Sequence, residues 1–403
     1  MDKNKSIVIL PKEQCTGCKL CGDCCPKGSI SFKEDNEGFL YPYVNEDTCI
    51  NCGLCVKQCP ALNVVKGEKT TSSYAVFASL DEAREKGSSG GVFGLLAEMV
   101  LASGGRVWGA AFNDELKLVH TKANTIEELN PLLKSKYIQS DLAGVYRQIK
   151  TDLKNGVRTL FCGTPCQVNA LRNYVGDNWD KLILVDFVCH GVPSQSLFDK
   201  AIQWYEKKHG VKVEWFQFRY KSEEVKHPQS YALKHKTERK IHVGLHYQFP
   251  YYFGFQKYIT LRPSCYRCKW ASPERSGDIT LGDYWGVEKY IPHLNAKEGV
   301  SMVLCNTAVG EKILDDLKIN GSVCVHELAI ENAMSENGCL RNPSSEKKER
   351  KEFFKNLEEK SFEEVVKLHL TPKKKWIFDL YYGMPSFLRQ IVRRVMDKRM
   401  KYE

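Results

Sequence analysis

The 403-residue sequence has no long hydrophobic run, and none approaches the roughly 18 residues that a membrane-spanning helix needs. The apolar stretch at residues 7–10 ends at Pro11 and is too short for the hydrophobic region of a signal peptide. Because the chain carries 17 cysteines and no export signal, we expect it in the reducing cytoplasm and without a disulfide framework.

The sequence also lacks a motif that reads nucleic-acid bases, although its formal net charge is +10. The excess is local: residues 341–403 hold 17 Lys and Arg against 10 Asp and Glu, whereas residues 1–66 hold 8 of each sign. A basic end without base-reading elements does not indicate a nucleic-acid partner, so we predict none. The length predicts about two or three domains.

The sequence does contain a repeated cysteine motif. Cys-x-x-Cys-x-x-Cys-x-x-x-Cys-Pro begins at Cys15 and again, 34 residues later, at Cys49. This spacing resembles the bacterial two-cluster ferredoxin, in which three closely spaced thiolates bind one 4Fe–4S cube and the fourth binds the other cube. A structural zinc needs only paired Cys-x-x-Cys motifs and leaves the third cysteine of each triplet unexplained.

The ferredoxin resemblance implies how two cubes share the thiols. One cube takes Cys15, Cys18, Cys21 and Cys59, and the other takes Cys49, Cys52, Cys55 and Cys25. Cys24 is surplus to this pattern. Each oxidised cube with four thiolates adds a charge of about −2, so the module becomes acidic when it is loaded.

Beyond this module, short apolar strands alternate with helices that end at glycine. We expect strands at residues 74–80, 106–112, 157–161 and 182–188, and helices at 92–102, 125–133, 141–155 and 194–208. This alternation predicts an α/β layer with a largely parallel or mixed sheet. A strand-rich stretch follows at 213–247, and the chain beyond residue 306 is expected to be mostly helical.

Two features of this body are candidates for binding sites. Cys162, Cys166 and Cys189 lie at or just after predicted strands, and Cys265-x-x-Cys268 is a metal-type pair, so a third metal centre and buried free thiols both remain open. The glycine- and serine-rich stretch 87–91 begins a helix and suits either a phosphate or a plain helix cap. It is not a dinucleotide fingerprint, because the G-x-G-x-x-G spacing is missing.

Five separated segments, at 87–91, 135–140, 161–167, 189–191 and 265–286, resemble in order the coenzyme F420 hydrogenase/dehydrogenase beta-subunit family. The resemblance covers residues 1 to about 340, and the segment 189–191 and the strand around Arg219 are similar to a bacterial branch. It implies a body that holds FAD beside a third 4Fe–4S cube. The cube ligands it favours are Cys166, Cys189, Cys265 and Cys268, with Cys162 spare. The flavin contacts it suggests are Ser88, Ser89, Gly90, Gly91, Lys136 and Thr164.

The predicted architecture is therefore an α+β ferredoxin-like two-cluster module, an α/β (mixed sheet) flavoprotein body and a helical C-terminal tail. We place the module at residues 1–66, the body at 74–340, and the basic tail at 341–403. The body divides into an N-terminal part of about 74–155 and a C-terminal part of about 156–340.

The function that the resemblance implies is that of an oxidoreductase. It would move electrons through FAD and 4Fe–4S clusters. On one side would be a hydride carrier, which is a deazaflavin in the family, or a low-potential donor, and on the other side would be other redox centres. The alternative is a non-catalytic electron-transfer subunit that feeds a partner enzyme. In either case we expect a redox partner protein or a small electron carrier.

The tail and the histidines carry two further expectations. Apolar residues at helical spacing from Trp376 to Val395, interleaved with arginines, indicate an amphipathic basic helix. Such a helix packs on the body or contacts an anionic membrane surface or an acidic protein. The histidines His227, His235, His242 and His246 lack ligand spacing and are expected at the surface.

Overall fold

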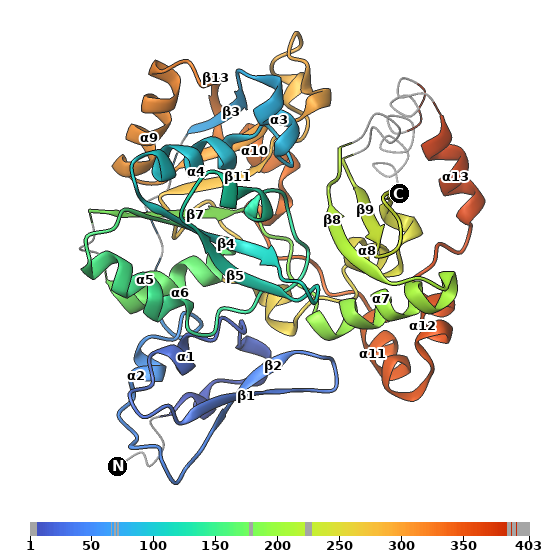
Figure 1. Cartoon of the computed structure of the whole chain (residues 1–403), viewed down its shortest axis with the longest axis horizontal. Helices are drawn as coiled ribbons and strands as arrows, with labels where there is room; N and C mark the ends of the chain where they lie inside the picture. The colour runs from blue at the N-terminus through green and yellow to red at the C-terminus, as the bar shows by residue number, and fades with distance from the viewer. Residues whose placement is uncertain are drawn as a thin grey trace.

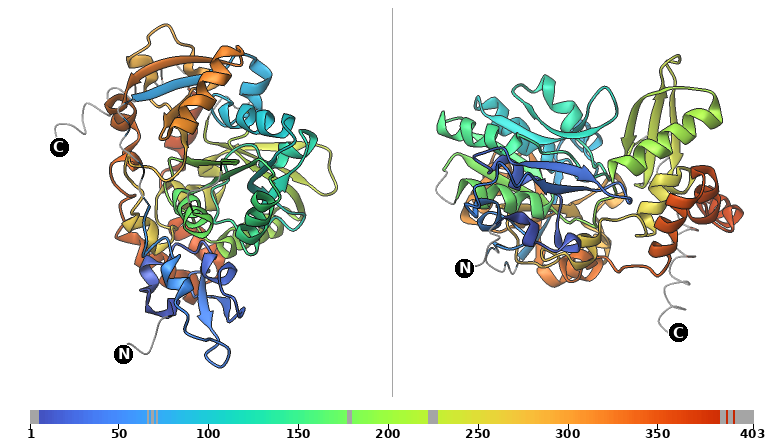
Figure 2. Two further views of the ribbon diagram at one scale, coloured as in Figure 1. Left: turned by 90° about the vertical axis from the view of Figure 1, so that its left-hand side faces the viewer. Right: turned by 90° about the horizontal axis from the view of Figure 1, so that it is seen from below.

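The computed structural model describes residues 6–65, 67, 70, 72–176, 180–221, 228–384, 388 and 392. The chain forms an N-terminal module, a body around a large sheet, and a lobe that combines a small sheet with the C-terminal helices (Figure 1). The module lies beneath α5 (Val145–Lys154) and α6 (Pro165–Val175) of the body. The lobe stands beside the large sheet in both Figure 1 and the right-hand view of Figure 2.

The N-terminal module is small and keeps the internal repeat of its sequence. It contains α1 (Leu20–Asp23), α2 (Leu54–Lys57) and an antiparallel hairpin of β1 (Ile30–Glu34) and β2 (Leu40–Val44). Each helix begins five residues after the first cysteine of its motif, behind a residue with a left-handed backbone, Lys19 (φ 64°) or Gly53 (φ 75°). These sharp entries turn each tri-cysteine loop back on itself, so that its sulfurs converge.

The body is built on an eight-stranded mixed sheet, in the order β13-β3-β12-β11-β7-β6-β4-β5. Its strands are β3 (Ser72–Ala78), β4 (Arg106–Phe112), β5 (Leu118–Ala123), β6 (Thr159–Gly163), β7 (Leu182–Phe187), β11 (Ile279–Asp283), β12 (Ser301–Cys305) and β13 (Val323–Ala329). The neighbours β4, β6, β7 and β11 run parallel, and the outer pairs are antiparallel. The predicted mixed sheet is confirmed. Because parallel strands share a carboxyl edge, the loops after β6, β7 and β11 open on the same side.

Helices cover both faces of this sheet. On one face α4 (Val92–Ala102) and α9 (Ala308–Ile319) pack on strand residues such as Leu160 and Ile183. On the other face lie α5 and α6, whose apolar cluster is continuous with the buried cysteines of the module. The short helices are α3 (Asp81–Lys86) and α10 (Ile330–Glu336), and 3-10 turns include Glu127–Leu132 and Pro263–Arg267.

The lobe combines strands from the middle of the chain with helices from its end. Its antiparallel sheet has the order β10-β9-β8, made of β8 (Val213–Phe218), β9 (Ser230–His235) and β10 (Ile241–Leu245). Around it lie α7 (Gln195–His209), α8 (Pro250–Gln256), α11 (Glu349–Glu359), α12 (Phe362–His369) and α13 (Lys375–Gly383). Phe353 and Val365 of α11 and α12 are buried in the same cluster as Phe198 and Phe218. The C-terminal region is thus helical, and its first two helices are part of this core.

Several elements differ from the expectations. The expected helix at 125–133 is a 3-10 helix that contains Pro131, and α5 starts at Val145 because Gly144 has a left-handed φ of 81°. The region beyond residue 306 contains the edge strand β13. The second half of the tail's amphipathic pattern, from Pro385 onward, lies outside the described residues except for Leu388 and Val392. Within the described chain, every helix is too short or too polar to cross a bilayer.

Candidate functional site

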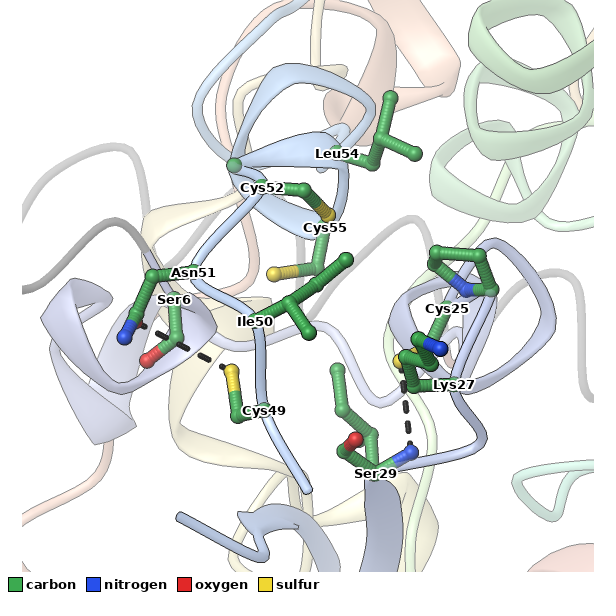
Figure 3. A pocket seen from close by; sticks show the side chains of 13 residues that line it. Ser6, Cys25, Lys27, Ser29, Cys49, Ile50, Asn51, Cys52, Leu54 and Cys55 are labelled. Carbon is green, nitrogen blue, oxygen red and sulfur yellow. Dashed lines mark hydrogen bonds between the residues drawn. The ribbon is translucent and has the colours of Figure 1, made fainter. Parts of the chain in front are cut away.

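Four thiols of the module surround one cavity. Cys49, Cys52 and Cys55 line it from one repeat, and Cys25 lines it from the other (Figure 3). The backbone N–H of Ser29 donates to the Cys25 sulfur at 3.3 Å. Cys52 is exposed to solvent, whereas Cys55 is buried. These four are the set that the ferredoxin resemblance assigns to a single cube, including the crossed-over Cys25.

The other four motif cysteines gather deeper in the protein. Burial raises the pKa of the Cys18 thiol well above its ordinary value, and the neighbouring thiols of Cys59 and Cys15 raise it further. Burial likewise raises the pKa of Cys21, with added contributions from Cys18, Cys15 and Cys59 among its neighbours. The structure thus brings Cys59 of the second repeat to the first tri-cysteine loop.

A third set of thiols lies at the carboxyl edge of the large sheet. Cys166 is in the first turn of α6, Cys189 follows β7, and Cys265 and Cys268 lie in and directly after the 3-10 turn Pro263–Arg267. The pKa of the Cys166 thiol is raised to about 12, chiefly by burial. A hydrogen bond with Thr164 opposes this rise, and the thiols of Cys268 and Cys189 add to it. Burial also raises the pKa of Cys189, and Cys265 adds to the effect. These four thiols are therefore neighbours.

Cys162 lies apart from this set. Burial raises its pKa to about 12, and the charged groups that contribute next are Asp186 and Lys136 rather than another thiol. By contrast Cys339, a buried thiol outside the predicted ligands, lies next to the set. Its sulfur is 3.3 Å from Nδ1 of His190, and it contributes to the raised pKa values of Cys189 and Cys268.

The described thiols are not gathered as tightly as the ligands of a bound zinc ion. A tetrahedral zinc with Zn–S bonds of about 2.3 Å holds its sulfurs about 3.8 Å apart. Among the residues that the structure describes, none of these twelve thiols belongs to a group of three or more ligand atoms within 4.8 Å of one another. All are free thiols. A 4Fe–4S cube takes four thiolates, one at each iron corner, which is the number in each set.

Arg262 joins the set that contains Cys15 to the third set. Its guanidinium is fully buried, and Nε donates to the Cys15 carbonyl at 2.6 Å while Nη2 lies 3.7 Å from the Cys15 sulfur. Nη1 donates to Oε1 of Gln139 at 2.9 Å. The same cation lowers the pKa of Cys265, although burial dominates there and raises it to about 12. Cys18 and Cys166 also influence each other, so the two sets are adjacent.

The glycine-rich loop 87–91 is held by its own surroundings. Oγ of Ser88 accepts from the backbone N–H of Ser135 at 2.7 Å, and Oγ of Ser89 donates to the Val300 carbonyl at 2.8 Å. A Cβ on Gly90 would lie 2.4 Å from the carbonyl oxygen of Val76. Close packing therefore requires glycine at this position, and the two serine hydroxyls have internal partners.

Basic side chains crowd around this loop. Arg219 donates to the Ser88 carbonyl at 2.8 Å and pairs with Asp283, and Nε of Arg219 has no hydrogen-bond partner within the described chain. The pKa of Lys221 is lowered to about 8, chiefly by burial and also by the cations Lys134 and Arg219. Burial also lowers the pKa of Lys136 to about 7. The carboxylate of Asp283 opposes part of this repulsion by raising the pKa of Lys221, and the Lys221 ammonium donates to the carbonyls of Arg84, Ser89 and Glu298.

The remaining candidate residues have defined positions. Lys136 donates to the carbonyls of Leu133 and Pro131 at 2.7 and 2.8 Å, and Thr164 caps α6 with its hydroxyl 3.1 Å from the Cys166 sulfur. The expectation that the histidines lie at the surface is wrong for His235 and His246, which are buried because the small sheet folds them against α7 and α8. His227 lies outside the described residues. Sequence reasoning also missed Arg262, since no local pattern marks a cation that acts on a distant loop.

Comparison with known proteins places two family models on the chain. Residues 156–331 match the model for the C terminus of the coenzyme F420 hydrogenase/dehydrogenase beta subunit, and residues 14–63 match a 4Fe-4S dicluster domain. The module is 38% identical over 66 residues to an uncharacterized ferredoxin of Methanocaldococcus jannaschii, a match that covers 15% of this chain and 84% of the relative. It is 46% identical over 43 residues to the ferredoxin-type protein NapF of Haemophilus influenzae, covering 11% and 24% of the two chains.

One solved structure also aligns with the chain. It is the xenon-derivatized F420-reducing NiFe hydrogenase complex from Methanosarcina barkeri, with 17% identity, a TM-score of 0.44, and coverage of 75% of this chain and 93% of that one. The two family models together span more than half of the sequence, in the order that the resemblance predicted. The chain therefore carries a 4Fe–4S dicluster domain followed by the C-terminal domain of the coenzyme F420 hydrogenase/dehydrogenase beta-subunit family.

Proposed function

We propose that this chain is an iron–sulfur flavoprotein oxidoreductase that moves electrons between a hydride carrier or a low-potential donor and the redox centre of a partner. The observation that carries the proposal is the succession of three thiol sets. It runs from the exposed Cys52, through the set around Cys18, to Cys166 at the edge of the large sheet. Redox groups placed in such a line connect a surface contact to a buried site.

The proposed ligands are the three sets as the fold arranges them. They are Cys25, Cys49, Cys52 and Cys55; Cys15, Cys18, Cys21 and Cys59; and Cys166, Cys189, Cys265 and Cys268. When bound, a 4Fe–4S cube exchanges single electrons, and FAD exchanges two electrons as a hydride. The proposed flavin contacts remain Ser88, Ser89, Gly90, Gly91, Lys136 and Thr164.

Groups around the thiols would tune the reduction potentials of the proposed clusters. The Arg262 guanidinium stabilises negative charge at Cys15 and Cys265. The Thr164 hydroxyl is placed to donate to a Cys166 thiolate, and the Gly191 N–H points at the Cys189 sulfur at 3.4 Å. Hydrogen bonds and positive charge at the sulfurs favour the more negative, reduced state and thus raise the reduction potential.

The cations at loop 87–91 supply the other half of the site. Arg219, Lys134 and Lys221 can hold an anionic group, because binding an anion relieves their mutual repulsion. Lys136, with a pKa of about 7, can hold or release a proton at neutral pH. These are the roles expected beside a flavin that exchanges a hydride.

The second candidate is an electron-transfer subunit without a substrate of its own. What favours it is the internal satisfaction of loop 87–91, whose serine hydroxyls bond to Ser135 and Val300 and so are already engaged. In this version the thiol sets alone act, and a partner protein supplies the catalytic site.

Cofactor analysis of the full chain after anaerobic purification separates these candidates. Three cubes predict roughly 12 iron and 12 sulfide per chain, four of each per cube, together with one FAD. Lys221→Met should weaken flavin retention and leave iron unchanged, whereas the exposed Lys375→Met should change neither. Full iron content without any flavin would leave the electron-transfer subunit as the function, and about eight iron would remove the third cube.

For the C-terminal end we propose a peripheral contact with an anionic surface. α13 packs Phe378 and Tyr382 against Tyr247, but Trp376 and Leu380 face solvent with 65% and 56% exposure. Three exposed lysines, Lys373, Lys374 and Lys375, precede them. Exposed apolar side chains next to basic ones are typical of segments that lie at a membrane interface.

A further inference from the structure

The hairpin of β9 and β10 brings together three side chains that can bind a metal ion. His235 is the last residue of β9, His242 is the second residue of β10, and Glu238 lies in the turn between them. One ligand atom from each of the three lies within 4.8 Å of the other two. The group belongs to the lobe's small sheet, and none of the cysteine sets contributes to it.

The separations match those around a bound ion. Nδ1 of His235 is 3.4 Å from Oε1 of Glu238, and Nε2 of His242 is 2.9 Å from Oε2. Ligand atoms at about 2.0–2.1 Å from one metal are about 3.4 Å apart in tetrahedral geometry and about 2.9 Å apart in octahedral geometry. The two imidazole rings stack with their centroids 4.1 Å apart. Small side-chain movements would therefore complete a coordination sphere.

A buried nitrogen that lacks a hydrogen bond adds to this geometry. His235 is only 5% exposed, and its Nδ1 makes no hydrogen bond within the described part of the chain. Its other nitrogen, Nε2, lies 3.4 Å from the hydroxyl of Tyr205 on α7. If Nε2 carries the proton and donates to Tyr205, the lone pair of Nδ1 faces Glu238. This arrangement, with the far nitrogen held by a second residue, is usual for metal-binding histidines.

The surroundings define which ion suits the site. Two imidazoles and one carboxylate favour divalent ions of the zinc class over Mg²⁺ or Ca²⁺, which prefer all-oxygen ligands. His209 stacks on Tyr205 at 4.3 Å and offers a further imidazole at the end of α7. The exposed turn residues Lys236, Arg239 and Lys240 are positively charged and lower the attraction of the turn for a cation. Glu238 is exposed and leaves a path for entry.

We propose that His235, Glu238 and His242 bind one divalent ion of the zinc class, and that this ion fastens the β9–β10 hairpin to α7 through Tyr205. To bind the ion through Nε2, His242 gives up the proton that this nitrogen donates to Glu238, and in a neutral ring that proton moves to Nδ1. The inference is independent of the redox proposal, since it uses no cysteine and no flavin contact.

The test is a Zn²⁺ titration of the cluster-loaded full chain by calorimetry, followed by hydrogen exchange. The wild type should bind one equivalent of Zn²⁺ that an excess of Mg²⁺ does not displace. That equivalent should be lost in His242→Gln and in Glu238→Gln, both of which change exposed or half-buried positions. Tyr205→Phe should weaken it by about 10- to 100-fold, the range for residues that support a metal ligand. Zn²⁺ should also slow amide exchange over residues 230–245 in the wild type alone.

His326→Gln is the matched control, because His326 is an exposed histidine on β13 that lies outside this group. It should bind Zn²⁺ as the wild type does. Equal stoichiometry and affinity in the wild type and in both hairpin variants would mean that the ion binds elsewhere, at cysteines, and would overturn the proposal. Absence of the equivalent in the wild type would overturn it as well.

Discussion

At the scale of single residues, the adjacent cysteines Cys24 and Cys25 differ in what surrounds their sulfurs. Cys25 faces the cavity that Cys49, Cys52 and Cys55 line. The Cys24 thiol instead donates to the Cys21 carbonyl at 3.5 Å and is packed in the apolar cluster beneath α6. We predict that Cys25→Ser lowers the iron and sulfide content by about four each per chain, because a cube loses a corner.

Cys24→Ser is the control for this change, because it alters the neighbouring thiol and should retain the full content of iron and sulfide. Electron paramagnetic resonance of the dithionite-reduced proteins would show which cluster signal disappears. Loss of a cluster in Cys24→Ser with none in Cys25→Ser would contradict the ligand assignment.

Lys136 predicts a dependence of stability on pH. Burial holds its folded-state pKa at about 7, below the ordinary value of about 10.4 in an unfolded chain. Between these values the unfolded chain binds more protons at this residue than the folded chain does, so stability rises with pH across that window. In Lys136→Met this contribution is absent. The difference in thermal unfolding midpoint between wild type and variant should therefore move in favour of the wild type from about pH 7 to pH 10.

An exposed lysine provides the comparison for this prediction. Lys375→Met should follow the wild type at every pH. A parallel pH profile for Lys136→Met would show that the ammonium is solvated and that its pKa is ordinary. Addition of pyrophosphate should reduce the wild-type slope, because a bound anion stabilises the protonated form of Lys136.

Arg262 predicts a shift in reduction potential. Removing a buried cation beside Cys15 disfavours the extra negative charge of the reduced cluster, so Arg262→Gln should make the potential of that cluster more negative. Arg262→Lys keeps the charge and should shift it less. The measurement is a potentiometric titration followed by electron paramagnetic resonance, with the exposed Arg341→Gln as a charge-matched control. An unchanged potential in Arg262→Gln would show that the guanidinium does not influence the reduction potential of the cluster.

At the scale of secondary-structure elements, the sequence predicts the ends of an element where glycines stand at those ends. The helix Val92–Ala102 and the strand Arg106–Phe112 have the predicted bounds, because Gly91 and the pair Gly104 and Gly105 punctuate the sequence. The strand β13 was not predicted, since its partner β3 is about 250 residues away in the sequence. Its seven residues mix exposed and partly buried positions at a sheet edge, so periodicity alone does not reveal them.

The candidate sites show the same division. The position of loops after parallel strands indicated that Cys162, Cys166 and Cys189 share one edge of the sheet, and only the family resemblance favoured Cys166, Cys189, Cys265 and Cys268 as one set. Arg262 could not be predicted as a site residue, because the Cys15 loop that it contacts lies about 250 residues earlier in the sequence. The histidines of the hairpin were also missed, since their approach depends on strand pairing between Leu233 and His242.

At the scale of the whole molecule, the N-terminal module and the helix α13 lie at separate places (Figure 1). The module, neutral in protein charge, becomes negative by about −4 when two cubes bind, and its exposed Cys52 lies among the apolar side chains of Ile50 and Leu54. The C-terminal end is basic. Opposite charges at separate places favour two different contacts, one for electron exchange and one for an anionic surface.

We therefore predict that replacing Trp376 and Leu380 by serine reduces binding to anionic vesicles and leaves the content of iron and flavin unchanged. These side chains are largely exposed, whereas Phe378 and Tyr382 on the same helix hold it to Tyr247. Deleting residues 385–403 should also weaken binding, because it removes basic residues while α13 keeps its packing.

Vesicle sedimentation at low and physiological salt measures the effect, which salt should diminish because it screens exposed charges. Neutral vesicles should bind the wild type and the variants equally weakly. If the serine variant loses iron or flavin while the wild type never binds vesicles, the exposed face of α13 serves the fold and not a surface contact.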